Sequence, residues 1–105
     1  MQAKAKNNPA TLDQIEKGQF RISGELDFQS VPIIWEKSQE LFGSSDSVVV
    51  DLTGVVRCNS AGLALLIQWM RYAKSLDKRI VFHHIPEQMR EIAKVCGVDQ
   101  FLPTP

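Results

Sequence analysis

The segment from Ser47 to Leu76 constrains the fold more than any other part of the sequence. Its first six residues, SVVVDL, form a continuous apolar and β-branched run of the kind found in strands that are buried on both faces. Turn residues follow at Thr53–Gly54, and the pattern then predicts a long helix from about Ser60 to Leu76. A buried strand that leads into a long helix is typical of the crossover between two parallel strands. The segment therefore favours an α/β fold.

The flanking segments predict the remaining elements of such a fold. Before Ser47, Thr11–Ile15 and Gln19–Ser23 form a predicted hairpin around Gly18. A helix then follows, capped by Ser30, with Pro32 in its first turn and a left-handed stop at Gly43. After Leu76, the pattern predicts a strand at Lys78–His84 and a helix from Pro86 to Gly97. The order β-β-α-β-α-β-α predicts a mixed sheet with an N-terminal hairpin, βαβ crossovers and helices packed on the sheet. The 105 residues suit one domain. We expect a loose tail at 1–10 and the domain at 11–105, with Phe101 and Leu102 folded back onto it.

The charge balance excludes several classes of partner. Twelve basic residues match twelve acidic ones, and the pI is near 6.7, which argues against a nucleic-acid binder and against a polybasic membrane anchor. The longest apolar runs, such as Leu63–Ile67, are far too short to span a bilayer, and no apolar segment follows the basic N-terminus. Cys58 and Cys96 lie far apart, without the spacing of a zinc site or a disulfide framework. These features predict a reduced, cytoplasmic protein that does not insert into a membrane.

The sequence offers few residues for catalysis. His83 and His84 are adjacent at the end of a predicted strand, where neighbours point to opposite faces, so at most one of them can assist a nucleophile. A Ser- or Cys-dependent enzyme built on Ser60 or Cys58 lacks a base and an orienting acid nearby. No cluster at metal-ligand spacing and no phosphate-binding glycine motif occurs. We therefore predict no enzyme, no metal and no cofactor.

Two short segments carry the candidate functional residues. Ser23–Asp27 follows the second strand, and its Glu25 and Asp27 are either an acidic pair or a solvated turn. Asn59 and Ser60 precede the long helix, where Ser60 fits the N-cap position. The unpaired N–H groups and the dipole of a helix N-terminus also favour an anion such as a phosphate at this position.

The long helix is apolar over about 220°, at 100° per residue, which is more than a helix needs to cover a sheet. One apolar stripe contains Leu63, Leu66, Ile67, Met70 and Ala73, and a second contains Leu65, Trp69, Tyr72 and Leu76. Either a neighbouring helix covers the second stripe or that stripe faces a partner. Aromatic residues next to arginine are typical of interface anchors.

Three segments in register resemble the STAS domain. They are Gly24-Glu-Leu-Asp27 after a strand, Asp51-Leu-Thr-Gly-Val55, and Asn59-Ser-Ala-Gly-Leu63 at a helix start. The resemblance spans about residues 11–102 and implies a single STAS-type domain. This family includes bacterial anti-anti-sigma factors, in which a kinase phosphorylates a serine of an Asp-Ser-Ser-Gly-Leu segment. Ser60 falls at that serine, although Asn59 and Ala61 replace its neighbours.

The chain is more similar to a second branch, the MlaB-type STAS subunits of phospholipid-transporting ABC complexes. Ser60-Ala-Gly-Leu-Ala-Leu-Leu66 and Ile34-Trp-Glu36 resemble segments of that branch. The resemblance implies a non-enzymatic accessory subunit that binds the cytoplasmic ATPase, supports assembly or activity in maintaining lipid asymmetry, and is peripheral to the inner membrane. The alternative is an anti-anti-sigma factor that binds an anti-sigma kinase and is switched by phosphorylation at Ser60. The expected partner-binding residues are Asn59, Ser60, Ala61, Leu65, Gln68, Trp69, Tyr72 and Asp27.

Overall fold

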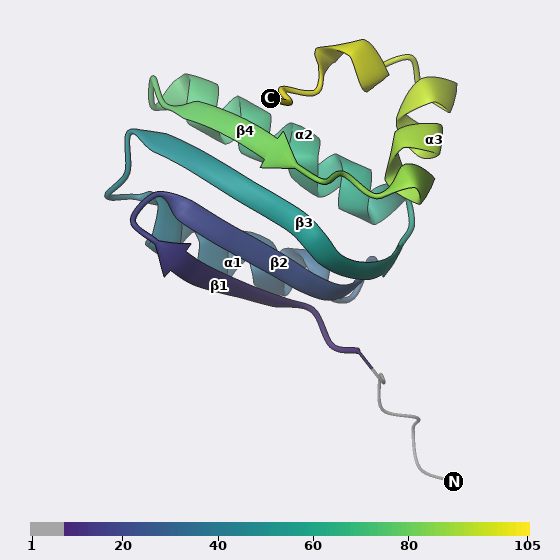
Figure 1. Ribbon diagram of the computed structural model, residues 1–105, viewed down its shortest axis with the longest axis horizontal. Helices are drawn as coiled ribbons and strands as arrows, with labels where there is room; N and C mark the ends of the chain where they lie inside the picture. The colour runs from purple at the N-terminus through teal and green to yellow at the C-terminus, as the bar shows by residue number, and fades with distance from the viewer. Residues whose placement is uncertain (1–7) are drawn as a thin grey trace, which may run out of the picture.

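A four-stranded mixed sheet forms the centre of the computed structural model, which describes residues 8–105 (Figure 1). The elements are β1 (Thr11–Glu16), β2 (Gln19–Leu26), α1 (Val31–Phe42), β3 (Ser47–Cys58), α2 (Ser60–Ser75), β4 (Arg79–His83), α3 (Glu87–Val95) and the short 3-10 helix η1 (Asp99–Phe101). The strand order is β1-β2-β3-β4, with β1 antiparallel to β2 and the other pairs parallel. The predicted hairpin and both βαβ crossovers are therefore confirmed.

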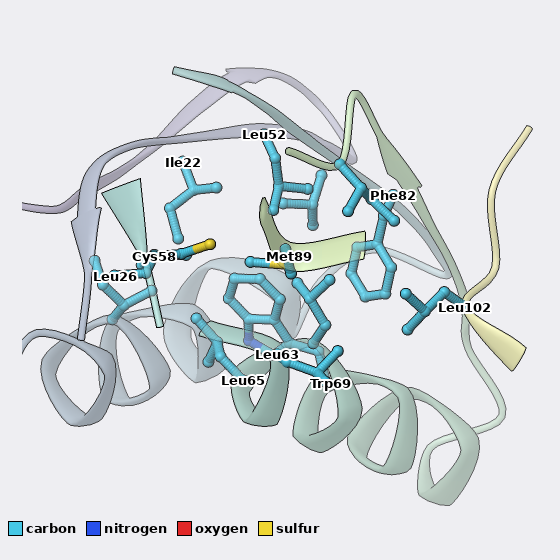
Figure 2. Packing of buried hydrophobic residues seen from close by; sticks show 14 of the residues in the cluster. Ile22, Leu26, Leu52, Cys58, Leu63, Leu65, Trp69, Phe82, Met89 and Leu102 are labelled. Carbon is cyan, nitrogen blue, oxygen red and sulfur yellow. The ribbon is translucent and has the colours of Figure 1, made fainter. Parts of the chain in front are cut away.

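Helices α1 and α2 lie on the same face of the sheet and leave the opposite face uncovered (Figure 1). Because the chain moves in one direction from β2 to β3 to β4, two crossovers of the same hand put both helices on one side. Helix α3 packs against α2 and β3. The core lies between the sheet and these helices, and Figure 2 shows side chains from both layers meeting there.

The ends of α1 differ from the prediction. Ser30 does not cap the helix with its side chain, and its hydroxyl donates to the Glu25 carbonyl at 2.8 Å instead. Gly43 has a φ of −59°, so the expected left-handed stop there is wrong. The Lys78 ammonium instead donates to the carbonyls of Gly43 and Ser45. This cation lies just past the end of α1, where a positive charge interacts favourably with the helix dipole.

Strand β3 does not turn at Thr53–Gly54 as predicted but continues to Cys58. Its pairing with β2 shifts twice, between Asp51 and Gly54 and again between Val55 and Arg57, so β3 contains two bulges. The Asp51 carboxylate accepts hydrogen bonds from the backbone N–H and the hydroxyl of Thr53, at 2.9 and 2.6 Å, which stabilise the first bulge. Gly54 is required there, because a Cβ would lie 2.2 Å from the Ser23 hydroxyl oxygen.

The second apolar stripe of α2 is covered by α1, which resolves the alternative left by the sequence. Trp69 is fully buried, and its indole N–H donates to the Ser38 hydroxyl of α1 at 2.8 Å. Tyr72, half-buried, meets Trp35 of α1 edge to face, with ring centroids 5.5 Å apart. Leu65 is also buried (Figure 2). The expectation that Leu65 and Trp69 face a partner is therefore wrong, since both belong to the core.

Both ends of the described chain attach to the sheet. The Asn8 carbonyl accepts a hydrogen bond from the Glu25 N–H, so residues 8–10 differ from the expected loose tail, whose residues 1–7 lie outside the described residues. At the other end, the Pro103 carbonyl accepts from the Phe82 N–H on β4. Leu102 folds back into the core as predicted, whereas Phe101 remains 63% exposed.

Candidate functional site

The candidate site lies at the edge of the sheet where β2 and β3 end. Leu26 is paired with Cys58, and the Asn59 N–H donates to the Leu26 carbonyl at 3.2 Å. The chain leaves this edge twice, through Asp27 toward α1 and through Asn59 toward α2. The topology therefore brings the two candidate segments of the sequence to the same place.

Asn59, not Ser60, caps helix α2. The Asn59 backbone is extended, and its side-chain oxygen accepts a hydrogen bond from the Ala61 N–H at 2.8 Å. Ser60 is the first helical residue, and its side chain is exposed. The capping role expected for Ser60 is thus wrong by one residue. Ala61, by contrast, is buried at the start of the helix, which corrects its expected place on the partner surface.

This assignment predicts opposite outcomes for two neighbouring alanine substitutions. Asn59→Ala removes a cap and is expected to lower the free energy of unfolding by about 1 kcal/mol. Ser60→Ala truncates an exposed side chain that does not cap the helix, so it should change the free energy of unfolding by less than ~0.5 kcal/mol, as is usual for exposed positions. Urea denaturation of both variants checks the pair. Equal losses, or a larger loss for Ser60→Ala, would contradict the assignment.

Asp27 fixes the turn through which the chain passes from β2 to α1. Its carboxylate accepts hydrogen bonds from the N–H groups of Gln29 and Ser30, both at 2.9 Å, and its carbonyl accepts from Val31. These bonds form the turn that precedes α1, so Asp27 does the work expected of a helix cap. Phe28, the next residue, is 71% exposed.

The accessible part of α2 is a narrow stripe on the face away from the sheet. We call the exposed residues Ser60, Ala64, Gln68 and Arg71 the outer stripe of α2; Lys74 and Ser75 are also exposed, in its last turn. Ala61, Leu65 and Trp69 are each one residue further along the chain and therefore turn inward. Of the expected partner-binding residues, the structure thus brings Ser60 and Gln68 together on one exposed face, with Asn59 beside them and Tyr72 at the margin.

Sequence reasoning missed three exposed apolar residues, one on this stripe and two near the ends of β2 and β3. Ala64 lies on the stripe itself, and its position at i+4 from Ser60 was a readable signal. Phe28 follows Asp27, and nothing in its local pattern shows that it is exposed. Val56, 62% exposed, is the extra residue of the second bulge in β3, which turns it outward. No periodic pattern in the sequence reveals that bulge.

A row of polar side chains crosses the uncovered face of the sheet. In one row across the four strands lie Asp13, Arg21, Asp51 and His83. The Asp51 carboxylate lies 3.4 Å from the Arg21 Nε and 3.0 Å from the Nδ1 of His84. Opposite charges on neighbouring strands stabilise a solvated sheet face.

Asp51 is held in its charged form. Burial raises its pKa, but hydrogen bonds from Thr53 and His84 lower it by more, so the pKa lies well below the usual range. The folded-state pKa is thus below the unfolded value of about 3.9. The network stabilises the fold above that pH, and its contribution is lost as the pH falls toward the folded-state pKa.

Comparison with known proteins identifies the fold. A family model described as "Mlab, STAS domain" matches residues 12–104. The chain belongs to this STAS-domain family. The match includes Asp27 and Asn59, where the chain leaves β2 and β3, and all of the described strands except the start of β1.

Solved STAS-domain structures agree with this assignment. The MlaB subunit in the Acinetobacter MlaFEDB complex, in an ATP-bound conformation, is 25% identical with a TM-score of 0.71, and the match covers 83% of this chain and 93% of that chain. The phosphorylated form of the Bacillus cell fate determinant SpoIIAA is 19% identical with a TM-score of 0.66, covering 91% and 90%. The unphosphorylated anti-sigma factor antagonist SpoIIAA is 17% identical, with a TM-score of 0.67 and coverage of 91% and 87%.

Within residues 8–105, no group of three or more His, Cys, Asp or Glu side chains is placed to hold a metal ion, and no helix is long and apolar enough to cross a bilayer. The His84 ring contacts Asp51 and the His83 ring. Ser60 is exposed at the N-terminus of α2, one helical turn before the exposed Ala64.

Proposed function

We propose that this chain is a non-enzymatic STAS subunit that binds the cytoplasmic ATPase subunit of an Mla-type, phospholipid-transporting ABC complex. The observation that carries the proposal is the match to the MlaB subunit of the MlaFEDB complex, together with the family model. In this role the chain supports assembly or activity of the complex that maintains lipid asymmetry. It is cytoplasmic and reaches the inner membrane through its partner.

The outer stripe of α2, together with Phe28, which follows Asp27 after the end of β2, supplies the partner-binding surface in this proposal. A small residue, Ala64, lies at the centre of the stripe between Ser60 and Gln68, so another backbone can approach the helix closely. Exposed aromatic residues are enriched among the anchors of protein interfaces, and Phe28 has that character. The paired charges of the uncovered sheet face make that face a less suitable contact, because a partner would have to desolvate them.

Affinity purification of the tagged chain from detergent-solubilised membranes and from cytosol tests the proposal. We expect an ABC-transporter ATPase, with its permease, to be retained from the membrane fraction. Ser60→Asp should retain its fold, because a carboxylate in the first turn of a helix is stabilising by roughly 0.3–1 kcal/mol, and yet bind the ATPase poorly. Full binding by Ser60→Asp would place this loop outside the interface.

The alternative function, an anti-anti-sigma factor, has one specific observation in its favour. The Ser60 hydroxyl is exposed at a helix N-terminus, where a phosphate is electrostatically favoured, and SpoIIAA is a structural neighbour. In the same purification, retention of a sigma-factor kinase from the cytosol, with phosphate on Ser60, would replace the first proposal by this one.

A further inference from the structure

The loop that presents Ser60 is held from α3 by one side chain. The Cys58 N–H, the last donor of β3, points to the side-chain oxygen of Gln88 at 3.3 Å, across 30 residues of sequence. The next N–H, that of Asn59, is held by β2 through the Leu26 carbonyl. Two consecutive N–H groups before Ser60 are thus fixed by two different elements.

The residue after Gln88 fixes the other side of the same loop. Met89 is fully buried, and its terminal methyl lies 3.0 Å from where a Cβ on Gly62 would be. Cys58 lies 3.2 Å from the same point, so Met89, Gly62 and Cys58 meet in one contact (Figure 2 shows Met89 beside Cys58). The first turn of α3 therefore contacts the chain at Cys58, directly before Asn59, and at Gly62, two residues after Ser60.

We propose that Gln88 is a positioning residue that holds the Asn59–Ser60 loop in the shape its partner binds. The inference rests on the proposed function, because it concerns the same surface. Gln88 is not on the outer stripe of α2, and it acts on that stripe through the Cys58 N–H. We call the hydrogen bond from the Cys58 N–H to the Gln88 side-chain oxygen the tether. Without it, the buried contact of Met89 remains, but the end of β3 can move. Binding must then restore the order of the loop, and this cost appears as weaker affinity.

Three variants separate the tether from general effects on α3. Gln88→Leu removes the acceptor at similar size, Gln88→Glu keeps an acceptor oxygen, and Gln100→Leu is a matched control on η1. Two quantities are measured: amide hydrogen exchange at Cys58 and Asn59 by NMR, and the Kd for the purified ATPase subunit recovered in the co-purification. A thermal melt of each variant reports the fold.

For Gln88→Leu we expect exchange at Cys58 to become about fivefold faster and the Kd to become about fivefold weaker, the factor that matches one net hydrogen bond of ~1 kcal/mol. The melting temperature should stay within a few degrees of the parent. Gln88→Glu should restore both quantities, and Gln100→Leu should change neither.

The outcomes distinguish this inference from the proposed function. If Gln88→Leu binds as tightly as the parent while Ser60→Asp does not, the interface stands and the positioning role of Gln88 is overturned. If exchange at Cys58 is unchanged, the tether itself is absent and the inference fails on structural grounds. If the parent chain binds no ATPase, the proposed function fails, and the positioning role fails with it, whatever the exchange data show.

Discussion

Replacing Trp69 by alanine is expected to lower the free energy of unfolding by about 3–5 kcal/mol, the range for large aromatic residues in cores. The indole is fully buried, and its ring centroid lies 5.4 Å from that of Phe42 and 6.4 Å from that of Phe82. The substitution leaves a cavity at the junction of the sheet with both large helices. It also removes the hydrogen bond from the indole N–H to the buried Ser38 hydroxyl, which keeps only its own bond to the Trp35 carbonyl. Urea denaturation followed by far-UV circular dichroism measures the loss.

Tyr72→Ala is the matched control for this experiment, since Tyr72 comes from the same stripe but is only half-buried against Trp35. Its loss should be clearly smaller than that of Trp69→Ala. If Trp69→Ala unfolds like the parent and instead abolishes partner binding, the indole is a surface anchor and the packing of α1 on α2 described above is wrong.

Ala64→Arg is expected to weaken binding of the ATPase partner by roughly 30-fold or more, which corresponds to about 2 kcal/mol. Ala64 is exposed at the centre of the outer stripe of α2, and arginine is a good helix former, so the fold should be retained. At an interface, the same side chain introduces bulk and an unpaired charge that must be desolvated. Isothermal titration calorimetry with the purified ATPase, beside a thermal melt, measures both effects.

Ser75→Arg places the same side chain at the last residue of α2, eleven residues and about 16 Å along the helix axis from Ala64. We expect this control to bind as the parent does. A weakened Ser75→Arg with a normal Ala64→Arg would move the interface to the C-terminal end of α2. Normal binding by both variants would remove α2 from the interface.

The width of the apolar arc on α2 was readable from the sequence, but what covers it was not. Hydrophobic periodicity showed that Trp69 and Tyr72 required burial, and it left a neighbouring helix and a partner as equal candidates. The Trp69 indole N–H is satisfied by Ser38, a residue 31 positions away that has no apolar signal of its own. Such a contact depends on the docking of α1, and a pattern within one segment cannot reveal it.

Residues that fix the local backbone were predicted less well than the elements themselves. Asn59 and Ser60 are both good capping residues, and the choice between them rests on a one-residue boundary that propensity does not resolve. Gly43 looked like a left-handed stop, but its backbone is right-handed, and Lys78, 35 residues away, donates to its carbonyl just past the end of α1. Gly97, with a φ of +73° after α3, is the position where the local signal sufficed.

Each bulge of β3 reverses which side chains face the core, and together the two cancel. Each adds one residue to β3 relative to β2, so the pairing offset grows from 30 residues at Arg21–Asp51 to 31 at Gly24–Val55 and 32 at Leu26–Cys58. Because side chains alternate with a period of two, one extra residue would turn Cys58 outward, and α2 would start on the wrong side of the sheet. Two extra residues restore the parity. Straightening both bulges with no residue removed would therefore leave Cys58 facing the core, whereas straightening one alone would turn Cys58 and the start of α2 away from their present side of the sheet.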